Sequence, residues 1–220
     1  MSEATAIATN LILSGTNVHL EEQDVQLKKP EKTVRVRAQL NDIIMSDFYH
    51  SIIRVQAPKG TEAWVIDVSG AQYSIFDACL GEKTYHKRFV TQTSATYKFG
   101  KNRAVYEAIK KLKGDGALMA RIGLFAAAKV DKAVANWKSH TKQEFSEFFL
   151  KAEGTFNEEK KRLLKEVARS FDDYDIEVAN KFSLDIKNTQ KYMLRMGGGW
   201  FACSDVTEVT DRIMTEHLVQ

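Results

Sequence analysis

Three residues of this chain have side chains that could act together in acid, base or nucleophilic chemistry: His50, Asp67 and Cys203. His50 and Asp67 stand near matching ends of two apolar segments, where a carboxylate could orient the imidazole and stabilise its cation. Cys203 follows Gly197-Gly198-Gly199 and directly precedes a predicted helix, whose free amides would favour the thiolate. The trio is typical of a cysteine-dependent hydrolase or acyltransferase.

Two strands must bring His50 and Asp67 together. Ser51–Gln56 and Glu62–Val68 are apolar at neighbouring positions, which is typical of strands covered on both faces. Pro58 to Gly60 predict the turn between them. In an antiparallel hairpin centred on that turn, His50 lies directly opposite Asp67, with the Cβ atoms about 5 Å apart. A slip of one residue would put the two side chains on opposite faces.

Each of these residues also has a purely structural explanation. A histidine at a strand end and an aspartate facing a turn can satisfy each other locally, without catalysis. The glycine run can be a simple loop, and Cys203 a small core residue, as free cysteines often are. Cys79 is expected to be buried for the same reason.

One block of the sequence carries a family resemblance: Trp64-Val-Ile-Asp67-Val-Ser69-Gly70-Ala-Gln72-Tyr73, preceded by the strand that His50 leads. It resembles a block in uncharacterised fungal proteins, some of which carry MYND-type zinc fingers. More distantly, the two strands are similar to the His and Asp strands of papain-like and transglutaminase-like cysteine hydrolases. The resemblance covers Leu40 to Val90. It implies His50 as base, Asp67 as orienting group and Gln72 as a donor to a developing oxyanion.

The chain departs from these families in its cysteines. Cys79 and Cys203 cannot supply the ligands of a MYND finger. The papain-like nucleophile precedes the histidine, but residues 1–49 contain no cysteine. Only a permuted order, with Cys203 after His50, would keep the catalytic set.

Composition limits the remaining possibilities. With 220 residues and 44% hydrophobic residues, the chain can bury one core with a helical extension. A net charge of +3, from 32 basic and 29 acidic residues, creates no strong field for nucleic acid. No motif indicates a cofactor or a metal ion, and no apolar run approaches the roughly 20 residues of a membrane span. Two cysteines and a poor match to a secretory signal favour a cytoplasmic protein.

The pattern changes along the chain from irregular to β-rich to helical. Residues 1–32 are expected to form a flexible arm because they mix small polar residues with charge clusters. Residues 33–220 are expected to form a single α+β domain. Its part 33–99 is β-rich, with an alternating strand at Thr33–Leu40 and short strands near Phe89 and Tyr97. Its part 101–218 is helical. The predicted fold is therefore a small, mostly antiparallel sheet followed by long amphipathic helices.

Helical periodicity begins after Gly100. The predicted helices pass through Val105 to Leu112, through Leu118 to Trp137, from residue 158 to 182 and from Ser204 to Leu218. Thr141-Lys-Gln-Glu144 and Thr155-Phe-Asn-Glu158 have the form of capping boxes. The second would end one helix near Gly154 and start the next at Glu158.

The leading functional interpretation is a non-catalytic intracellular binding or scaffolding protein on a hydrolase-like framework. Its partner would dock on the long helices or beside His50, near four residues that could bind it: Trp64, Gln72, Tyr73 and Trp200. A cysteine hydrolase or acyltransferase is the first alternative, and self-association through the helix of residues 158–182 is the second. The basic aromatic run Tyr85–Phe89 could grip phosphates, but it is more typical of a solvated strand edge. Nucleic acid is not an expected partner.

Overall fold

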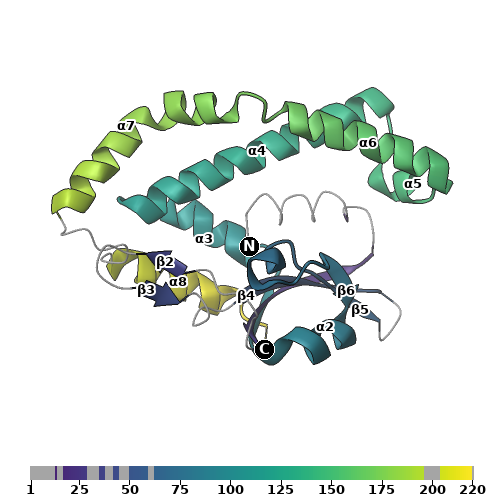
Figure 1. Ribbon diagram of the computed structural model, residues 1–220, viewed down its shortest axis with the longest axis horizontal. Coiled ribbons are helices and arrows are strands. Elements are labelled where there is room, and N and C mark those ends of the chain that lie inside the picture. The colour runs from purple at the N-terminus through teal and green to yellow at the C-terminus, as the bar shows by residue number, and fades with distance from the viewer. Residues whose placement is uncertain are drawn as a thin grey trace. The chain divides into compact units, whose positions relative to one another are not determined.

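The computed structural model describes residue 13 and residues 17–28, 35–37, 42–44, 50–58, 62–195 and 204–219. These residues divide into two compact units (Figure 1). The sheet unit contains Asn17–Lys101 and the C-terminal residues from Met214, and the helical unit contains Asn102–Ile213. The division falls where the sequence pattern changes from strand to helix. The α+β fold class is confirmed.

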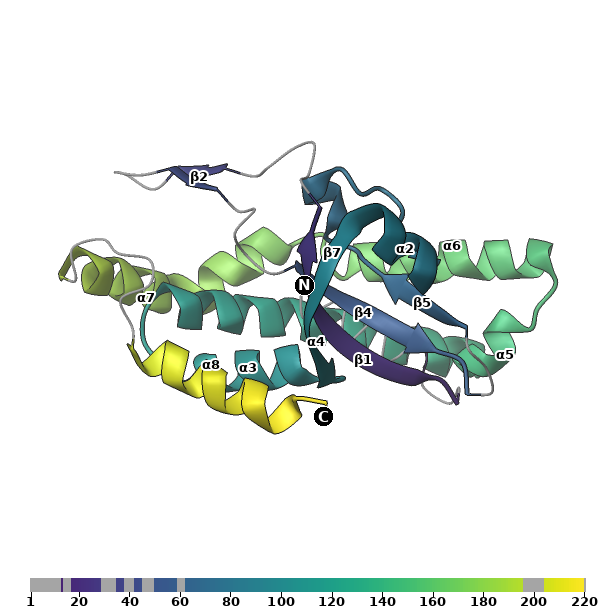
Figure 2. The same cartoon turned by 90° about the horizontal axis from the view of Figure 1, so that it is seen from below.

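Five strands form one antiparallel sheet in the part of the chain that the structure describes. In sheet order they are β6 (Cys79–Gly81), β5 (Ala63–Ile66), β4 (His50–Gln56), β1 (His19–Leu27) and β7 (Val90–Lys98). Helix α2 (Glu82–Phe89) lies against β5, β6 and β7 on one face (Figure 2). Two further strands, β2 (Arg35–Arg37) and β3 (Asp42–Ile44), pair separately.

Strand β4 is the centre of the sheet, as its apolar sequence predicts. Ile52 and Ile53 are fully buried on its opposite faces. Strand β5 differs from the prediction, because Ala63 and Val65 are buried whereas Trp64 between them is exposed. The buried faces of β4 and β5 contribute to one apolar core under α2.

Strand β1 corrects the prediction of a flexible arm at residues 1–32, which is wrong for residues 19–27. This strand pairs with β4 on one side and β7 on the other. Its Glu22 and Asp24 are buried, and each has a partner distant in sequence. Glu22 accepts the Gly100 amide at 2.9 Å. Asp24 lies 3.2 Å from the Lys101 ammonium and accepts the Ser51 hydroxyl at 2.6 Å.

The basic aromatic run is helical, which corrects the prediction of a strand edge. Tyr85 and Phe89 lie one turn apart on α2, so both face the sheet while the charged residues between them face outward. The strand predicted over residues 33–40 is described only at residues 35–37, as β2. That short strand lies outside the main sheet.

The C-terminal residues return to the edge of the sheet. Helix α8 (Ser204–His217) occupies the predicted position. After it, Leu218 bridges to Tyr97 of β7, and the Val219 amide donates to the Thr96 carbonyl at 2.8 Å. Part of the β7 edge is therefore covered by the chain itself.

The helical unit is built along one long helix. Its members are α3 (Lys101–Ile109), α4 (Asp115–Thr141), α5 (Phe145–Phe149), α6 (Glu153–Arg169), α7 (Tyr174–Arg195) and the part of α8 up to Ile213. Helices α6 and α7 run beside successive parts of α4 (Figure 1). On α4, Val130, Val134 and Trp137 are buried and pack on Phe145 and Phe148 of α5. None of the helices in the described ranges is long and apolar enough to cross a membrane.

The predicted helix of residues 158–182 is two helices. The chain turns between Arg169 and Tyr174, where the Ser170 hydroxyl donates to the Val167 carbonyl and competes with the helical pattern. The Lys129 ammonium binds the freed Ser170 carbonyl at 2.8 Å. This break divides the helix on which the self-association alternative was based.

Both predicted capping boxes are also wrong in position. Thr141 is the last residue of α4 and donates to the Trp137 carbonyl at 2.8 Å. The observed box starts at Glu144 and uses Glu147, at the start of α5. Helix α6 starts at Glu153, before the second proposed box.

Candidate functional site

His50 and Asp67 do come together in the sheet unit. The Nε2 atom of His50 lies 2.9 Å from Oδ1 of Asp67, and the two side chains are only 4% and 1% exposed. The distance is that of a hydrogen bond, but the contact falls outside ordinary hydrogen-bond geometry. The proximity predicted from the two strands is therefore present.

The strand register differs from the one predicted. Strands β4 and β5 pair Ile53 with Ile66 and Val55 with Trp64, which is two residues away from a register that would join His50 directly to Asp67. A shift of two residues keeps each side chain on its face, because strand side chains alternate with a period of two. His50 itself pairs with Val25 of β1. The two side chains meet diagonally, beyond the last pair of the β4–β5 ladder.

Asp67 has partners for both carboxylate oxygens. The Tyr85 hydroxyl donates to Oδ2 at 2.7 Å, opposite the side that faces His50. The backbone amide of Gly70 also lies close enough to stabilise the carboxylate. A buried carboxylate requires such partners, since an unpaired buried charge is strongly destabilising.

Gly70 is required at its position by close packing on Asp67. A Cβ atom at residue 70 would stand 2.4 Å from Oδ2 and 2.9 Å from Cγ of Asp67. Gly70 starts the one-turn helix η2 (Gly70–Tyr73), which places Tyr73 against the imidazole of His50. The Tyr73 and His50 rings pack edge to face with centroids 5.0 Å apart.

The local electrostatics follow from burial and from these contacts. Burial alone would raise the pKa of Asp67, but His50, then Tyr85 and the Gly70 amide stabilise the carboxylate and bring its pKa below the ordinary value. Burial, and the Asp67 charge next, raise the pKa of Tyr73. The same two causes raise the pKa of Tyr85 far above its ordinary range. Asp67 is thus ionised and both tyrosines are neutral at neutral pH.

The other predicted site residues are not brought to this cluster by any described contact. Trp64 is 37% exposed on β5. The backbone of Gln72 belongs to η2, but its side chain lies outside the described residues, as do Trp200 and Cys203. The pairing of Cys203 with His50 therefore stays a prediction. Cys79 is exposed, which corrects the expectation that it is buried.

Tyr85 and Gly70 are the members of the cluster that the sequence analysis missed. A signal for Tyr85 exists in its spacing of four from Phe89, which is typical of a helix face. A signal for Gly70 exists in Asp67-Val-Ser-Gly70, since Asp and Gly at such spacing are typical of a tight turn. Within the described residues no group of three or more His, Cys, Asp or Glu side chains is arranged to hold a metal ion.

Comparisons with known proteins give no relative on which to base a function. No protein-family model, no curated protein and no solved structure matches the chain. The function therefore has to be argued from the geometry of the two units.

Proposed function

We propose that this chain is a non-catalytic binding protein, with a protein partner that docks on the helical unit. The observation that carries the proposal is the burial of the His50–Asp67 pair. A general base must reach its substrate, but the His50 ring is covered by Tyr73 and is almost fully buried. The pair acts as an internal polar contact that fixes β4, β5 and α2.

The resemblance to cysteine hydrolases fits this proposal if the chain descends from such an enzyme. A hydrolase-like framework that has lost its upstream nucleophile would keep its His and Asp strands where they stabilise the sheet. The exposed free thiol of Cys79 is consistent with a reducing, intracellular location. We take the protein to be cytoplasmic on that ground.

The docking surface that we propose is the outward face of α7. Ile176 and Leu184 are 62% and 68% exposed. Each lies two residues, or about 200° around the helix, from a residue that packs on α4, namely Tyr174 and Phe182 respectively. Exposed apolar side chains on a helix face are typical of docking positions when they lie close together.

The charge beside this surface indicates the chemistry of the partner. Asp172, Asp173 and Asp175 are exposed next to Ile176, and none of the three forms an ion pair with a residue that the structure describes. A segment with basic and apolar side chains would complement both features. A second copy of the chain is the remaining alternative, now through α7 alone rather than a continuous helix.

Selection from a library of random peptides tests the proposed surface. We expect the enriched peptides to combine Lys or Arg with Leu, Ile or Phe, and to lose at least about tenfold in affinity for the double variant D175K/I176D. The matched control is Leu164→Asp on α6, where the side chain is 59% exposed. If the peptides bind D175K/I176D with the same affinity as the unaltered chain, α7 is not the docking surface. A molar mass in light scattering that doubles with concentration, and does not double for I176D, would identify a second copy instead.

Thiol labelling tests the catalytic alternative. Cys79 is an exposed internal reference, so iodoacetamide labelling can compare the two cysteines in one sample. A structural role for His50 predicts that Cys203 reacts no faster than Cys79. Faster labelling of Cys203 that slows in His50→Gln would support a catalytic pair and contradict the proposal.

A further inference from the structure

Helix α2 of the sheet unit has a positively charged outward side. Lys83 and Lys87 each lie two residues from Tyr85, whose buried ring marks the side of α2 that packs on the sheet. Two residues correspond to about 200° around a helix, so both lysines point away from the sheet. Both are exposed, and neither forms an ion pair with another residue that the structure describes. Their charges are therefore available to a partner.

A highly exposed aromatic side chain lies beside this helix. Phe76 is 79% exposed, more than any other phenylalanine, tyrosine or tryptophan among the described residues. The next residue, Asp77, lies 3.4 Å from the Arg88 guanidinium, which places Phe76 near the last turn of α2. The Lys28 ammonium donates to the Lys87 carbonyl on the same turn. We call this group the α2 surface, and its members are Phe76, Lys28, Lys83, Lys87 and Arg88.

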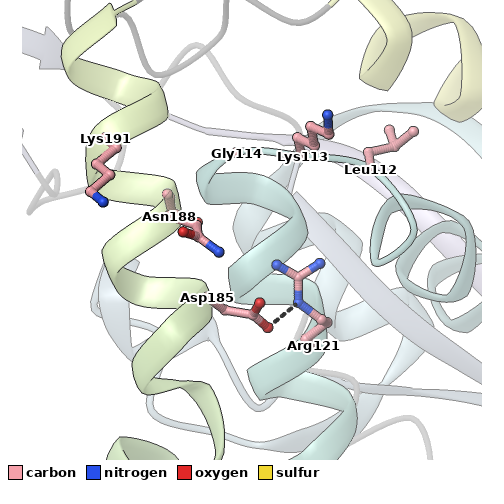
Figure 3. Close-up of a pocket in the computed structure, with 8 residues that line it drawn as sticks. Leu112, Lys113, Gly114, Arg121, Asp185, Asn188 and Lys191 are labelled. Atoms are coloured by element: carbon pink, nitrogen blue, oxygen red, sulfur yellow. Dashed lines mark ion pairs between the residues drawn. The ribbon is translucent and has the colours of Figure 1, made fainter.

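The proposed docking surface on α7 has the opposite charge. Two other acidic residues of this helix are neutralised by α4. Oδ2 of Asp185 lies 3.2 Å from Nε of Arg121 (Figure 3). The Glu177 carboxylate lies 2.5 Å from the Lys129 ammonium. By contrast, the three exposed aspartates beside Ile176 have no such cation within the described ranges, so their negative charge is available to a partner.

The two surfaces complement each other in charge and in apolar character. The α7 surface has exposed carboxylates around Ile176, and the α2 surface has exposed cations around Phe76. Aromatic side chains are frequent anchors of protein interfaces, and opposite charges around an anchor favour encounter and fix orientation. The α2 surface thus has the basic and apolar side chains that we expect of the segment that docks on α7.

We infer that the α7 surface of one copy of this chain binds the α2 surface of a second copy. The inference rests on the proposed function, because it names the partner of the α7 surface. The two surfaces belong to different units and differ in sequence, so the contact is heterologous. Each pair of copies keeps one unoccupied surface of each kind, and further copies extend it into an open chain or close it into a ring.

Light scattering of two complementary variants tests the inference. F76S/K87E removes the aromatic anchor and reverses one charge on the α2 surface, and D175K/I176D makes the equivalent changes on the α7 surface. We expect the molar mass of the unaltered chain to rise with concentration beyond that of two chains. Each variant alone should associate at least about tenfold more weakly. An equimolar mixture of the two variants should form a species of twice the chain mass and none larger, because one intact surface of each kind remains.

Two controls make this test specific. L164S/K165E makes the same kinds of change as F76S/K87E at exposed positions of α6, and it should associate as the unaltered chain does. Raising the ionic strength from about 0.05 to about 0.5 M should weaken the association several-fold, because exposed charges are screened. Circular dichroism verifies that each variant is folded.

Three results would overturn the inference, and they separate it from the proposed function. If the unaltered chain stays monomeric at its highest soluble concentration, the copies do not bind each other, and the peptide selection alone decides whether α7 is a docking surface. If D175K/I176D abolishes association but F76S/K87E does not, α7 is a docking surface and α2 is not its partner. If both variants associate as the unaltered chain does, neither surface forms the contact.

Discussion

His50 and Asp67 meet at 2.9 Å although neither is the other's partner in the β4–β5 ladder. Their contact closes the end of that strand pair, with Tyr85 of α2 on the second oxygen of the carboxylate. The same few atoms thus join β4, the end of β5 and α2. A buried contact of this kind stabilises the fold, and the two side chains are only 4% and 1% exposed.

Removing the charge of Asp67 should destabilise the sheet unit. Asp67→Asn keeps the shape but leaves His50 and Tyr85 without their shared anion, so we expect a loss of about 3 kcal/mol in the free energy of unfolding. Urea denaturation measures this loss. The control is Asp77→Asn, whose half-exposed carboxylate lies 3.4 Å from Arg88 and should cost less than about 1 kcal/mol. Equal effects of the two variants would contradict a structural role for the buried pair.

Gly70 should not tolerate a methyl group. Gly70→Ala would place Cβ 2.4 Å from Oδ2 of Asp67, so the carboxylate or η2 must move, at an expected cost of about 1–3 kcal/mol. Gly154→Ala is the matched control, because its Cβ would meet nothing within 4 Å in helix α6. That control should stabilise the protein by about 0.5–1 kcal/mol. Thermal unfolding of both variants gives the comparison, and a neutral Gly70→Ala would refute the close packing.

The stabilisation from Asp67 should depend on pH in the acid range. Because the pKa of Asp67 is lower in the folded state than its ordinary value of 3.8, its contribution is complete above that value. The contribution is lost as the pH falls through the lower folded pKa. The difference in unfolding free energy between the unaltered chain and Asp67→Asn should therefore be constant near neutral pH and shrink below about pH 4. A difference that grows as the pH falls would mean that folding raises the pKa of Asp67, which would contradict this account.

The buried ion pair of β1 should behave differently when one or both partners are replaced. Lys101→Met leaves the Asp24 carboxylate buried with the Ser51 hydroxyl as its one side-chain partner among the described residues, so we expect a loss of about 3 kcal/mol. The double variant K101M/D24L removes both charges and should recover part of that loss. Chemical denaturation of the single and double variants measures the coupling. The assignment is contradicted if the double variant loses more unfolding free energy than the two single variants lose together.

The sequence was sufficient for the strands that carry the candidate site. Adjacent apolar residues at Ile52 and Ile53 predict a central strand, and period-two alternation keeps His50 and Asp67 on one face even though the register is shifted by two. A sequence pattern defines the face of a side chain but not its exact pairing, because a shift of two residues preserves the pattern.

Long-range partners explain what the sequence did not reveal. Strand β1 contains Glu22 and Asp24, which resemble a solvated loop until Gly100 and Lys101 supply their partners from far along the chain. Helix α2 was missed because aromatic residues in a charged run are also typical of an edge strand. The Lys129 ammonium likewise binds the Ser170 carbonyl, at the end of α6, from a helix distant in sequence.

Chemical modification of the histidines tests whether the His50 ring is closed to solvent. Diethyl pyrocarbonate should modify His19 and His140, which are exposed and act as internal controls, while His50 at 4% exposure stays unmodified in the folded protein. Peptide mass analysis before and after unfolding in urea gives the rate at each ring. Protection of His50 that disappears on unfolding is the expected result. Modification of His50 in the folded protein as fast as that of His19 would show an accessible base and contradict a structural, non-catalytic pair.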